Sequence, residues 1–277
     1  MRIFITGRSG FIATNLINAL THHHVIGSSS RDDDITLSLM TFLPDIICHL
    51  AAESYDADKM VESNILLTHS ILEYCRKYPV KKLILFGSSS EYGQKDHPLT
   101  EQDSLEPRTI YEGTKAAASM LARAYAHTYT IPTIIVRPLS IYGPHEHPNK
   151  LMTRLFSGRI THLNDAVHDW TYIDDFIGAV LVLINNPLPY IFDTVNVGLG
   201  VQRSNREVLL HAERILGRKI SVEMHTTSMG AGSDSMLWMC DPTHLKTRYG
   251  FTPSITLEDG MTRHYTWFMK SLTKSHT

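Results

Sequence analysis

The amino-acid sequence predicts an α/β fold built on a doubly wound parallel sheet, with a smaller, mostly helical C-terminal lobe. Short apolar segments alternate with segments of helical length from Arg2 to Gly200. Such an alternation favours parallel strands joined by right-handed helical crossovers. The apolar segments are continuous rather than alternating, which is typical of strands covered on both faces. After Gly200 the sequence becomes mostly helical, and this change predicts the lobe.

The expected strands are short apolar runs bounded by turn-forming or charged residues. In chain order they span 2–6, 25–28, 45–50, 83–88, 133–137 and 194–197. The helices between them carry apolar residues at helical spacing, as Val61, Ile65 and Leu72 do. They span 11–20, 59–78, 110–129 and 174–184.

The regular alternation is interrupted at 143–167, which is rich in His, Pro and Gly. Three further helices are expected after Gly200, at 206–216, 242–249 and 256–268. We therefore expect residues 1–142 and 168–200 to form the sheet domain. Residues 143–167 and 201–277 would form the lobe, over the carboxyl edge of the sheet.

Composition excludes several classes of protein. The chain has 277 residues, of which 43% are hydrophobic and 19% charged, as in ordinary globular domains. The net charge of −2 predicts no broad surface for nucleic acid or for an anionic membrane. The longest apolar run, 176–184, is far too short to span a bilayer. No signal-peptide pattern follows Met1, and the three widely spaced cysteines form no disulfide framework, so we expect a cytoplasmic protein.

Glycines stand where the first expected strand meets the first expected helix. Gly7 would allow a tight turn, Gly10 would let the backbone approach a pyrophosphate, and Ala13 is small enough for helix–strand packing. Free N–H groups at the start of the helix would bind the phosphates. The pattern predicts a Rossmann-type dinucleotide site, and its alternative is a plain glycine turn.

The end of the second strand indicates which dinucleotide is bound. An acidic residue there would bind the ribose 2′-hydroxyl of NAD. The sequence has Ser29, Ser30 and Arg31 instead, a set that suits a 2′-phosphate, so we expect NADP(H) slightly ahead of NAD(H). The three aspartates at 32–34 argue for NAD(H), and the alternative is that Arg31 only pairs with them.

A tyrosine and a lysine lie one helical turn apart, at Tyr111 and Lys115. An ammonium group lowers the pKa of a nearby phenol, and such a tyrosine exchanges a proton with a carbinol while hydride moves to or from a nicotinamide. A hydroxyl partner is expected from the preceding strand, which ends in Ser88, Ser89 and Ser90. Taken alone, this spacing is more often ordinary helix surface.

Together these motifs resemble the extended short-chain dehydrogenase/reductase family in its nucleotide-sugar branch, over nearly the whole chain. The matching segments are 6–12, 49–52, 88–93, 111–115, 137–138, 142–144, 168–175 and 196–198. The resemblance implies NAD(P)-dependent hydride transfer at C4 of a nucleotide-linked hexose. It also implies that the sheet domain binds the dinucleotide, that the lobe binds the nucleotide sugar, and that the chain forms a homodimer.

The resemblance implies roles for single residues. The catalytic hydroxyl, acid/base and lysine would be Ser89, Tyr111 and Lys115; alignment on Glu91 selects Ser89, whereas alignment on Tyr92 selects Ser88. The implied cofactor contacts are Gly7, Ser9, Gly10, Phe11, Ile12, Ser29, Ser30, Arg31, Asp34, Ile35, Leu50, Ala51, Ala52, Ser88, Tyr111, Lys115, Pro138 and Ile141. The implied substrate contacts are Ser90, Glu91, Tyr142, Arg154 and His168. His168 replaces an arginine of many relatives, which would make substrate binding weaker or pH-dependent.

Three reactions fit this resemblance. The segment after the second strand and the segment 87–93 resemble 4-keto-sugar reductases, such as GDP-4-keto-6-deoxymannose reductases, and we expect this activity first. Glu91 would supply the elimination acid of a 4,6-dehydratase, and a 4-epimerase needs only the three catalytic groups. The alternative outside enzymes is a dinucleotide-binding regulator, which would not need Ser89, Tyr111 and Lys115. No metal site is expected, since the histidine-rich segments 22–24 and 145–147 are interpreted as surface and loop residues.

Overall fold

The computed structural model describes residues 1–28, 35–225 and 237–274, and its centre is a six-stranded parallel sheet. The strand order is β2-β1-β3-β4-β5-β9. In that order the strands span His24–Ser28, Arg2–Thr6, Ile46–His49, Lys82–Phe86, Thr133–Pro138 and Phe192–Val197. Every neighbouring pair is parallel. The doubly wound parallel sheet expected from the sequence is confirmed.

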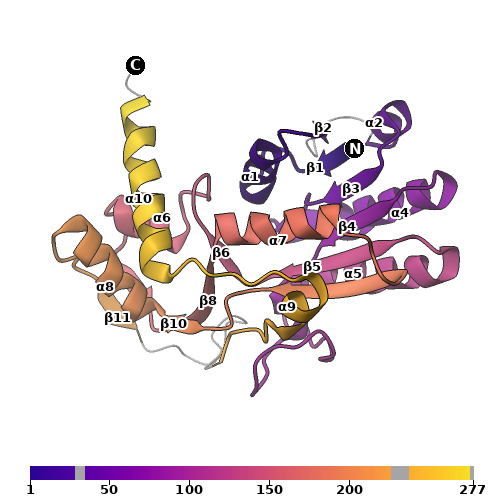
Figure 1. Ribbon diagram of the computed structural model, residues 1–277. Coiled ribbons are helices and arrows are strands. Elements are labelled where there is room, and N and C mark those ends of the chain that lie inside the picture. The colour runs from indigo at the N-terminus through magenta and orange to yellow at the C-terminus, as the bar shows by residue number, and fades with distance from the viewer. Residues whose placement is uncertain (29–34, 226–236, 275–277) are drawn as a thin grey trace.

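Helices cover both faces of this sheet (Figure 1). α1 (Phe11–Ala19) and α7 (Ile173–Asn185) contact each other on one face. α2 (Ile35–Phe42), α4 (Leu67–Lys77) and α5 (Ile110–Tyr129) cover the opposite face. Among the described helices, none is both long enough and apolar enough to cross a membrane.

The strands contribute side chains to two apolar cores, one on each face of the sheet. Ile3 and Ile5 of β1 belong to the core beneath α1 and α7. Phe4, which lies between them and points the other way, belongs to the core that includes Leu72 of α4. Both faces of the sheet are therefore buried, which explains why the strand sequences are continuously apolar.

The helical segment after β3 contains one wide turn. α3 (Ala57–Met60) runs into a π-helical turn, η1 (Val61–Leu66), before α4 begins. Asn64 in this turn is 2% exposed. The sequence predicts one uniform helix over 59–78, because a single wide turn hardly changes the apolar spacing.

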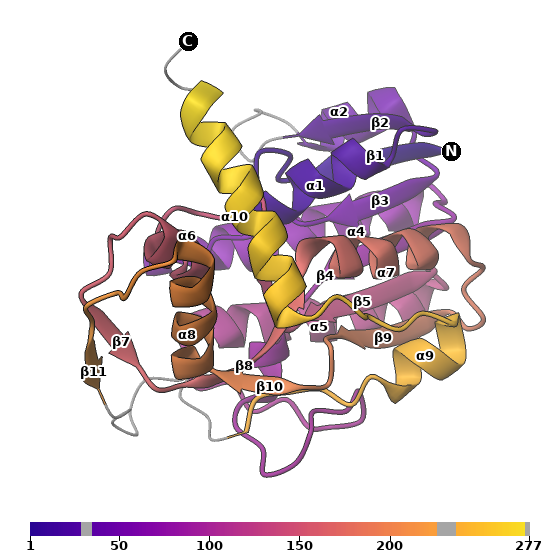
Figure 2. The same cartoon turned by 60° about the vertical axis from the view of Figure 1, so that its left-hand side comes forward.

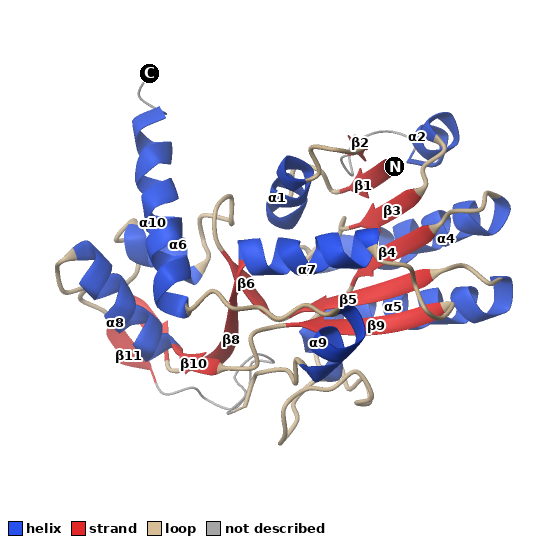
Figure 3. Cartoon of the chain, in the orientation of Figure 1, coloured by secondary structure: helices blue, strands red, loops and turns tan. Residues whose placement is uncertain are grey.

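A lobe lies at the carboxyl ends of the sheet strands, towards which the arrows point (Figure 3). Its helices α6, α8 and α10 contact one another and span Leu151–Phe156, Asn205–Leu216 and Leu257–Lys274. Its three-stranded sheet has the order β10-β8-β6, over Gln202–Ser204, Val167–Tyr172 and Ser140–Tyr142. A parallel pair, β7 (His162–Asn164) and β11 (Glu223–His225), lies at its outer side (Figure 2).

The expected division of the chain differs from the structure in two places. β6 falls in a segment assigned to the sheet domain, as does nearly all of β8, but both form a separate sheet with β10, which falls in the segment assigned to the lobe. α9 (Thr243–Tyr249) was expected in the lobe, but it packs against β9 and α7 of the sheet domain. Both differences come from tertiary pairing that local sequence does not encode.

The three cysteines are free and buried in separate places. Cys48 lies in β3 and Cys75 in α4, and burial raises the pKa of each to about 12. Cys240 lies against Asp169 of β8, with its Sγ 3.6 Å from the carboxylate. None of them forms a disulfide, as the sequence predicts.

Candidate active site

The segments singled out in the sequence meet at the carboxyl edge of the six-stranded sheet. The glycine turn follows β1, the chain at 50–52 follows β3, and the serine segment 88–90 follows β4. Because the strands are parallel, these ends lie on one side and face the lobe (Figure 3). Pro138 ends β5 at the same edge, and Ile141 follows in β6.

The turn after β1 fits a dinucleotide pyrophosphate. Gly7 has a φ of +69°, and a Cβ on it would lie 2.9 Å from the Cα of Ala51, so only glycine fits there. Gly10 begins α1 without a side-chain cap, and the first turn carries no acidic residue. α5 and α8, in contrast, begin with complete capping boxes. The uncapped N–H groups of α1 therefore suit an anion, beside the predicted contacts Ser9, Phe11 and Ile12.

A buried histidine fixes the chain that follows β3. His49 has its Nδ1 2.7 Å from Thr6 Oγ1 and its Nε2 2.9 Å from Thr68 Oγ1. The Thr68 hydroxyl donates to the Asn64 carbonyl, so it accepts from Nε2–H, and Nδ1 accepts from the Thr6 hydroxyl. Thr6 in turn accepts from the N–H of Ala51 at 3.0 Å. Burial lowers the pKa of His49 to about 3, so the neutral ring holds the predicted contacts Leu50, Ala51 and Ala52 in place.

Tyr111 and Lys115 project from the first turns of α5 towards the end of β4. Burial raises the pKa of the Tyr111 phenol, and an interaction with the nearby Ser88 side chain has a smaller, lowering effect on that pKa. Lys115 is 6% exposed and donates to the carbonyl of Phe86. Burial lowers the pKa of Lys115. The sequence predicts that Lys115 lowers the pKa of Tyr111. In the structure, burial has the largest effect on the pKa of each group.

The hydroxyl beside Tyr111 belongs to Ser88 rather than to the expected Ser89. Ser88 is the N-cap of a short 3₁₀ turn, η2 (Ser89–Tyr92), and its Oγ accepts from the N–H of Ser90 at 3.2 Å. The Ser88 and Ser90 hydroxyls lie 2.7 Å apart. Ser89 is 5% exposed, inside the turn. This geometry favours the alignment on Tyr92 over the alignment on Glu91.

Glu91 was expected at the substrate, but the structure encloses its side chain, which is 0% exposed. Its Oε1 accepts from the Ser88 N–H at 2.8 Å, and its Oε2 accepts from Arg137 Nε at 2.9 Å. A Cβ on Gly87 would lie 2.5 Å from Oε1, so the carboxylate occupies the space that a side chain would need. A glutamate three residues after an N-cap serine folds back in this way, and the capping-box pattern was the signal for it.

Arg137 extends this buried network across the sheet edge. Its Nη1 donates to the hydroxyl of Tyr92 at 2.7 Å, and that hydroxyl donates to Asn196 Oδ1 at 2.8 Å. The N–H of Asn196 donates to Glu101 at 2.8 Å. The network therefore ties together the chain after β4 and the strands β5 and β9, a role that the sequence analysis did not assign to these residues.

Asn64 is a second residue that the sequence analysis missed. Its Oδ1 accepts from the Glu53 N–H at 2.7 Å, and its Nδ2 donates to the Glu53 carbonyl at 2.9 Å. The same Nδ2 donates to Thr114 Oγ1, whose hydroxyl donates to the Tyr111 carbonyl. Asn64 thus connects the chain after β3 with the helix that carries Tyr111. The only signal in the sequence is an asparagine on the apolar side of an expected helix.

The expected substrate contacts lie in different surroundings. Tyr142 was expected at the substrate, but it is 1% exposed, and its hydroxyl donates to the Leu257 carbonyl at 3.3 Å, so it belongs to the core. Arg154 lies on α6, with its Nε 3.3 Å from the Arg159 carbonyl. His168 lies 3.2 Å from Ser140 Oγ, and burial lowers its pKa to about 4. The ring is therefore neutral near pH 6.5, where the sequence predicts titration.

The residues expected to select the cofactor, Ser29, Ser30, Arg31 and Asp34, lie outside the described residues, and Ile35 begins α2. A third missed residue, Arg8, lies in the glycine turn after β1 and contacts the end of β2. Its N–H donates to the Ser28 carbonyl at 3.1 Å, and its Nη1 is 3.5 Å from the Gly27 carbonyl. A Cβ on Gly27 would lie 2.7 Å from the Arg8 Cβ, so the side chain runs along this strand end.

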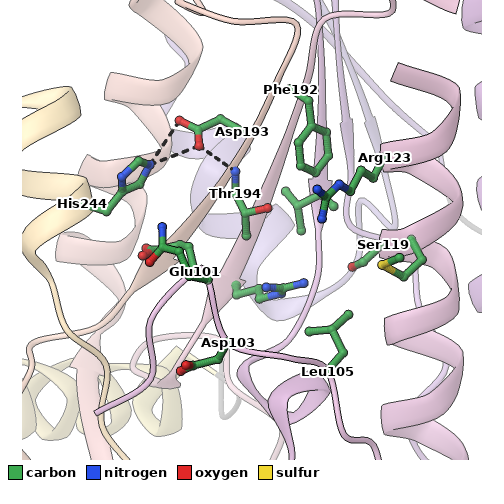
Figure 4. A pocket seen from close by; sticks show the side chains of 13 residues that line it. Glu101, Asp103, Leu105, Ser119, Arg123, Phe192, Asp193, Thr194 and His244 are labelled. Atoms are coloured by element: carbon green, nitrogen blue, oxygen red, sulfur yellow. Dashed lines mark hydrogen bonds and ion pairs between the residues drawn. The ribbon is translucent and has the colours of Figure 1, made fainter. Parts of the chain in front are cut away.

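A cavity of about 380 Å³ lies apart from these groups, between α5, β5, β9 and the segment 101–105 (Figure 4). Asp193 and His244 form an ion pair at 3.1 Å on its wall. Burial raises the pKa of Glu101, which also lines the cavity. None of the predicted cofactor or substrate contacts lines this cavity, so it is not the site that the sequence predicts.

Known proteins are similar to this chain in sequence and in fold. An uncharacterized UDP-glucose epimerase of Bacillus subtilis, YtcB, is 28% identical over 95% of this chain and 96% of its own length. The dTDP-glucose 4,6-dehydratase of Escherichia coli is 25% identical over 98% and 94%. The structure of UDP-glucuronic acid 4-epimerase from Bacillus cereus, in complex with UDP-glucuronic acid and NAD, has a TM-score of 0.88 and 24% identity, and covers 98% of this chain and 100% of that one.

A model of one family matches most of the chain, residues 3–198, including the glycine turn, the serine segment, Tyr111 and Lys115. With the sheet and the motifs in agreement, the chain belongs to the NAD dependent epimerase/dehydratase family and is an enzyme of that family.

Proposed function

We propose that the protein oxidises and reduces C4 of a nucleotide-linked hexose, and that it acts as a nucleotide-sugar 4-epimerase. The observation that carries the proposal is the grouping of Ser88, Tyr111 and Lys115 at the same edge of the sheet as the uncapped start of α1. The similarity to UDP-glucose and UDP-glucuronic acid epimerases supports a uridine diphosphate sugar as the substrate.

Two catalytic groups would act on the C4 oxygen. Tyr111 takes the proton of the C4 hydroxyl and later returns it, and Ser88 hydrogen-bonds to the same oxygen. Lys115, held by the Phe86 carbonyl, would bind the ribose of the dinucleotide. When bound, the dinucleotide supplies the hydride acceptor and donor. Between the two transfers the 4-keto sugar turns over, so that hydride returns to its other face.

Glu91 argues against a 4,6-dehydratase. Elimination needs an acid or base close to C5 and C6 of the sugar. The serine segment presents hydroxyls, and the carboxylate of Glu91 is enclosed with Arg137. The similarity to dTDP-glucose 4,6-dehydratases therefore supports the shared oxidation at C4 rather than the elimination step.

A 4-keto-sugar reductase is the second candidate, and Arg8 is the observation that favours it. The guanidinium lies at the end of β2, where a 2′-phosphate would be bound. Reductases that exchange NADP(H) in each cycle need such a contact, whereas an epimerase that recycles its NAD does not. The variant Arg8→Ala should weaken NADPH binding more than NADH binding if this candidate is right, as measured by fluorescence titration; equal losses would remove it.

Tyr111→Phe tests the chemistry. The freshly purified wild-type and variant proteins would be denatured, and released dinucleotide would be identified by mass spectrometry. Both should release the same amount, because Phe keeps the packing of the ring. Interconversion of UDP-glucose or UDP-glucuronic acid with its C4 epimer should fall by about 10²-fold or more in the variant, since the acid/base is lost. Full activity of Tyr111→Phe would contradict the proposal.

A homodimer is also proposed, through the outer face of η1, α4 and α5. Val61, Leu66 and Ile110 are 50%, 55% and 60% exposed on these elements. η1, α4 and α5 contact one another, so their outer faces form one surface. Exposed apolar side chains on adjoining elements favour association with a second copy.

A further inference from the structure

The outer strand pair of the lobe, β7 and β11, brings three metal-ligating side chains together. The parallel register places Glu223 opposite His162 and His225 opposite Asn164, so the three side chains share the outward face. Their ligand atoms all lie within 4.8 Å of one another. We propose that His162, Glu223 and His225 bind one divalent transition-metal ion of the zinc class.

The distances fit coordination better than hydrogen bonding alone. His162 Nδ1 is 3.1 Å from His225 Nε2 and 3.4 Å from Glu223 Oε2. Two ligand atoms on one tetrahedral zinc ion lie about 3.3 Å apart, given bond lengths of about 2.0–2.1 Å. A single proton on His162 Nδ1 bonds well to only one of the other two atoms. A divalent ion binds all three lone pairs at once.

The strands that carry these ligands are anchored on their other face. Leu163, between His162 and Asn164, is 4% exposed in the core, and Met224 packs against the same core. Backbone hydrogen bonds close the ladder at both ends, from Glu223 N–H to the Thr161 carbonyl at 2.8 Å and from Asp165 N–H to the His225 carbonyl at 3.2 Å. The backbone therefore holds the three ligand positions close together, and their exposed side chains are free to adjust around an ion.

The donor set selects the class of metal. Two imidazole nitrogens with one carboxylate suit Zn²⁺, Ni²⁺, Co²⁺ or Cu²⁺, whereas Mg²⁺ and Ca²⁺ prefer oxygen ligands throughout. Water would complete a tetrahedral sphere, since the site lies on the surface (Figure 2). The ion would crosslink β11 to β7 and so stabilise the lobe. It would bind at the outer side of the lobe, away from Tyr111.

Calorimetric titration of full-length, tag-free protein with Zn²⁺ tests the proposal. We expect one strong site in the wild type, and a loss of about tenfold or more in affinity for His225→Ala and for His162→Ala, because each removes one of the few ligands. The matched control is His22→Ala, which removes an exposed histidine from the separate run at 22–24 and should bind as the wild type does. No strong site, or a site lost in the control and kept in His225→Ala, would overturn the proposal.

Thermal denaturation gives a second readout that does not depend on heats of binding. Zn²⁺ that binds only the folded protein should raise the melting temperature of the wild type, by mass action. His225→Ala should keep the metal-free melting temperature, because its side chain is exposed, and should lose the increase. An equal increase in both proteins would contradict the proposed ligands.

Discussion

At the residue scale, the candidate active site depends on buried polar groups that do not contact substrate. Glu91 accepts hydrogen bonds from the Ser88 backbone and from Arg137. Removing one partner of a buried ion pair costs about 3–5 kcal/mol, because the remaining charge is left without compensation. Substitution of Glu91 or Arg137 is therefore expected to act through folding stability rather than through the chemical step.

The two candidate serines can be separated by matched substitutions. Ser88→Ala removes the hydroxyl that interacts with Tyr111, so kcat should fall by about 10²-fold, as for the loss of one oriented hydrogen-bonding group at a reacting oxygen. Ser89→Ala should leave kcat within a few-fold of the wild type, because Ser89 lies inside η2. Steady-state kinetics with a UDP-hexose measures both. The reverse ranking would restore the alignment on Glu91.

At the element scale, α10 packs over the lobe through a histidine in apolar surroundings. His264 is 0% exposed, and neither ring nitrogen has a hydrogen-bond partner among the described residues. The rings of Phe156 and Trp267 lie beside it, at 5.4 and 6.1 Å between centroids. Burial lowers the pKa of His264 from 6.5 to about 4. α10 therefore packs around a neutral imidazole, whose apolar surroundings disfavour its protonation.

This position predicts a specific sensitivity to acid. Below pH 6.5 the unfolded chain takes up a proton at His264 while the folded protein does not, so stability falls by about 1.4 kcal/mol per pH unit until about pH 4. His264→Phe should remove this loss and gain about 2 kcal/mol over the wild type on going from pH 8 to pH 5. Urea denaturation at both pH values measures the difference. An unchanged pH dependence in His264→Phe would show that the ring titrates in the folded protein.

The elements differ in how far their sequences predict them. α5 is predicted to the residue, at 110–129, from its long amphipathic pattern, and the structure shows that a capping box of Thr109 and Glu112 begins it. The strands β6, β7, β10 and β11 have three residues each and form only through tertiary pairing, so no local pattern reveals them. The motifs likewise place the serine segment at the end of β4. Which serine faces Tyr111, and where Glu91 points, depends on the 3₁₀ turn, and no spacing rule separates the two alignments.

At the scale of the whole molecule, the parallel topology explains why distant segments form one site. The end of β1, the end of β4 and the start of α5 lie far apart in the chain, and the sheet brings them to one edge. The lobe covers this edge, with α10 from the C-terminal end of the chain beside α6 and α8 (Figure 2). A nucleotide sugar bound between them would contact both parts of the protein.

A charged substitution on the proposed contact surface of η1, α4 and α5 tests the homodimer. Leu66→Glu should convert a dimer to a monomer in analytical ultracentrifugation, because burying a carboxylate in an apolar contact is strongly unfavourable. Leu210→Glu on α8 is the matched control, since Leu210 is 43% exposed on a helix of the lobe. Dissociation in the control, or none in Leu66→Glu, would place the contact elsewhere.

The three buried cysteines can report local opening of the folded protein. A thiol reagent modifies Cys48, Cys75 or Cys240 only in molecules that have opened around that thiol. The rate of modification at each cysteine therefore measures how often the surrounding region opens. Cys48 reports on the sheet at β3, Cys75 on α4, and Cys240 on the chain beside Asp169 of β8. Mass spectrometry of partly modified protein would rank these regions without any engineered label. Modification of Cys240 ahead of Cys48 would mean that the chain around β8 loosens while the sheet stays intact.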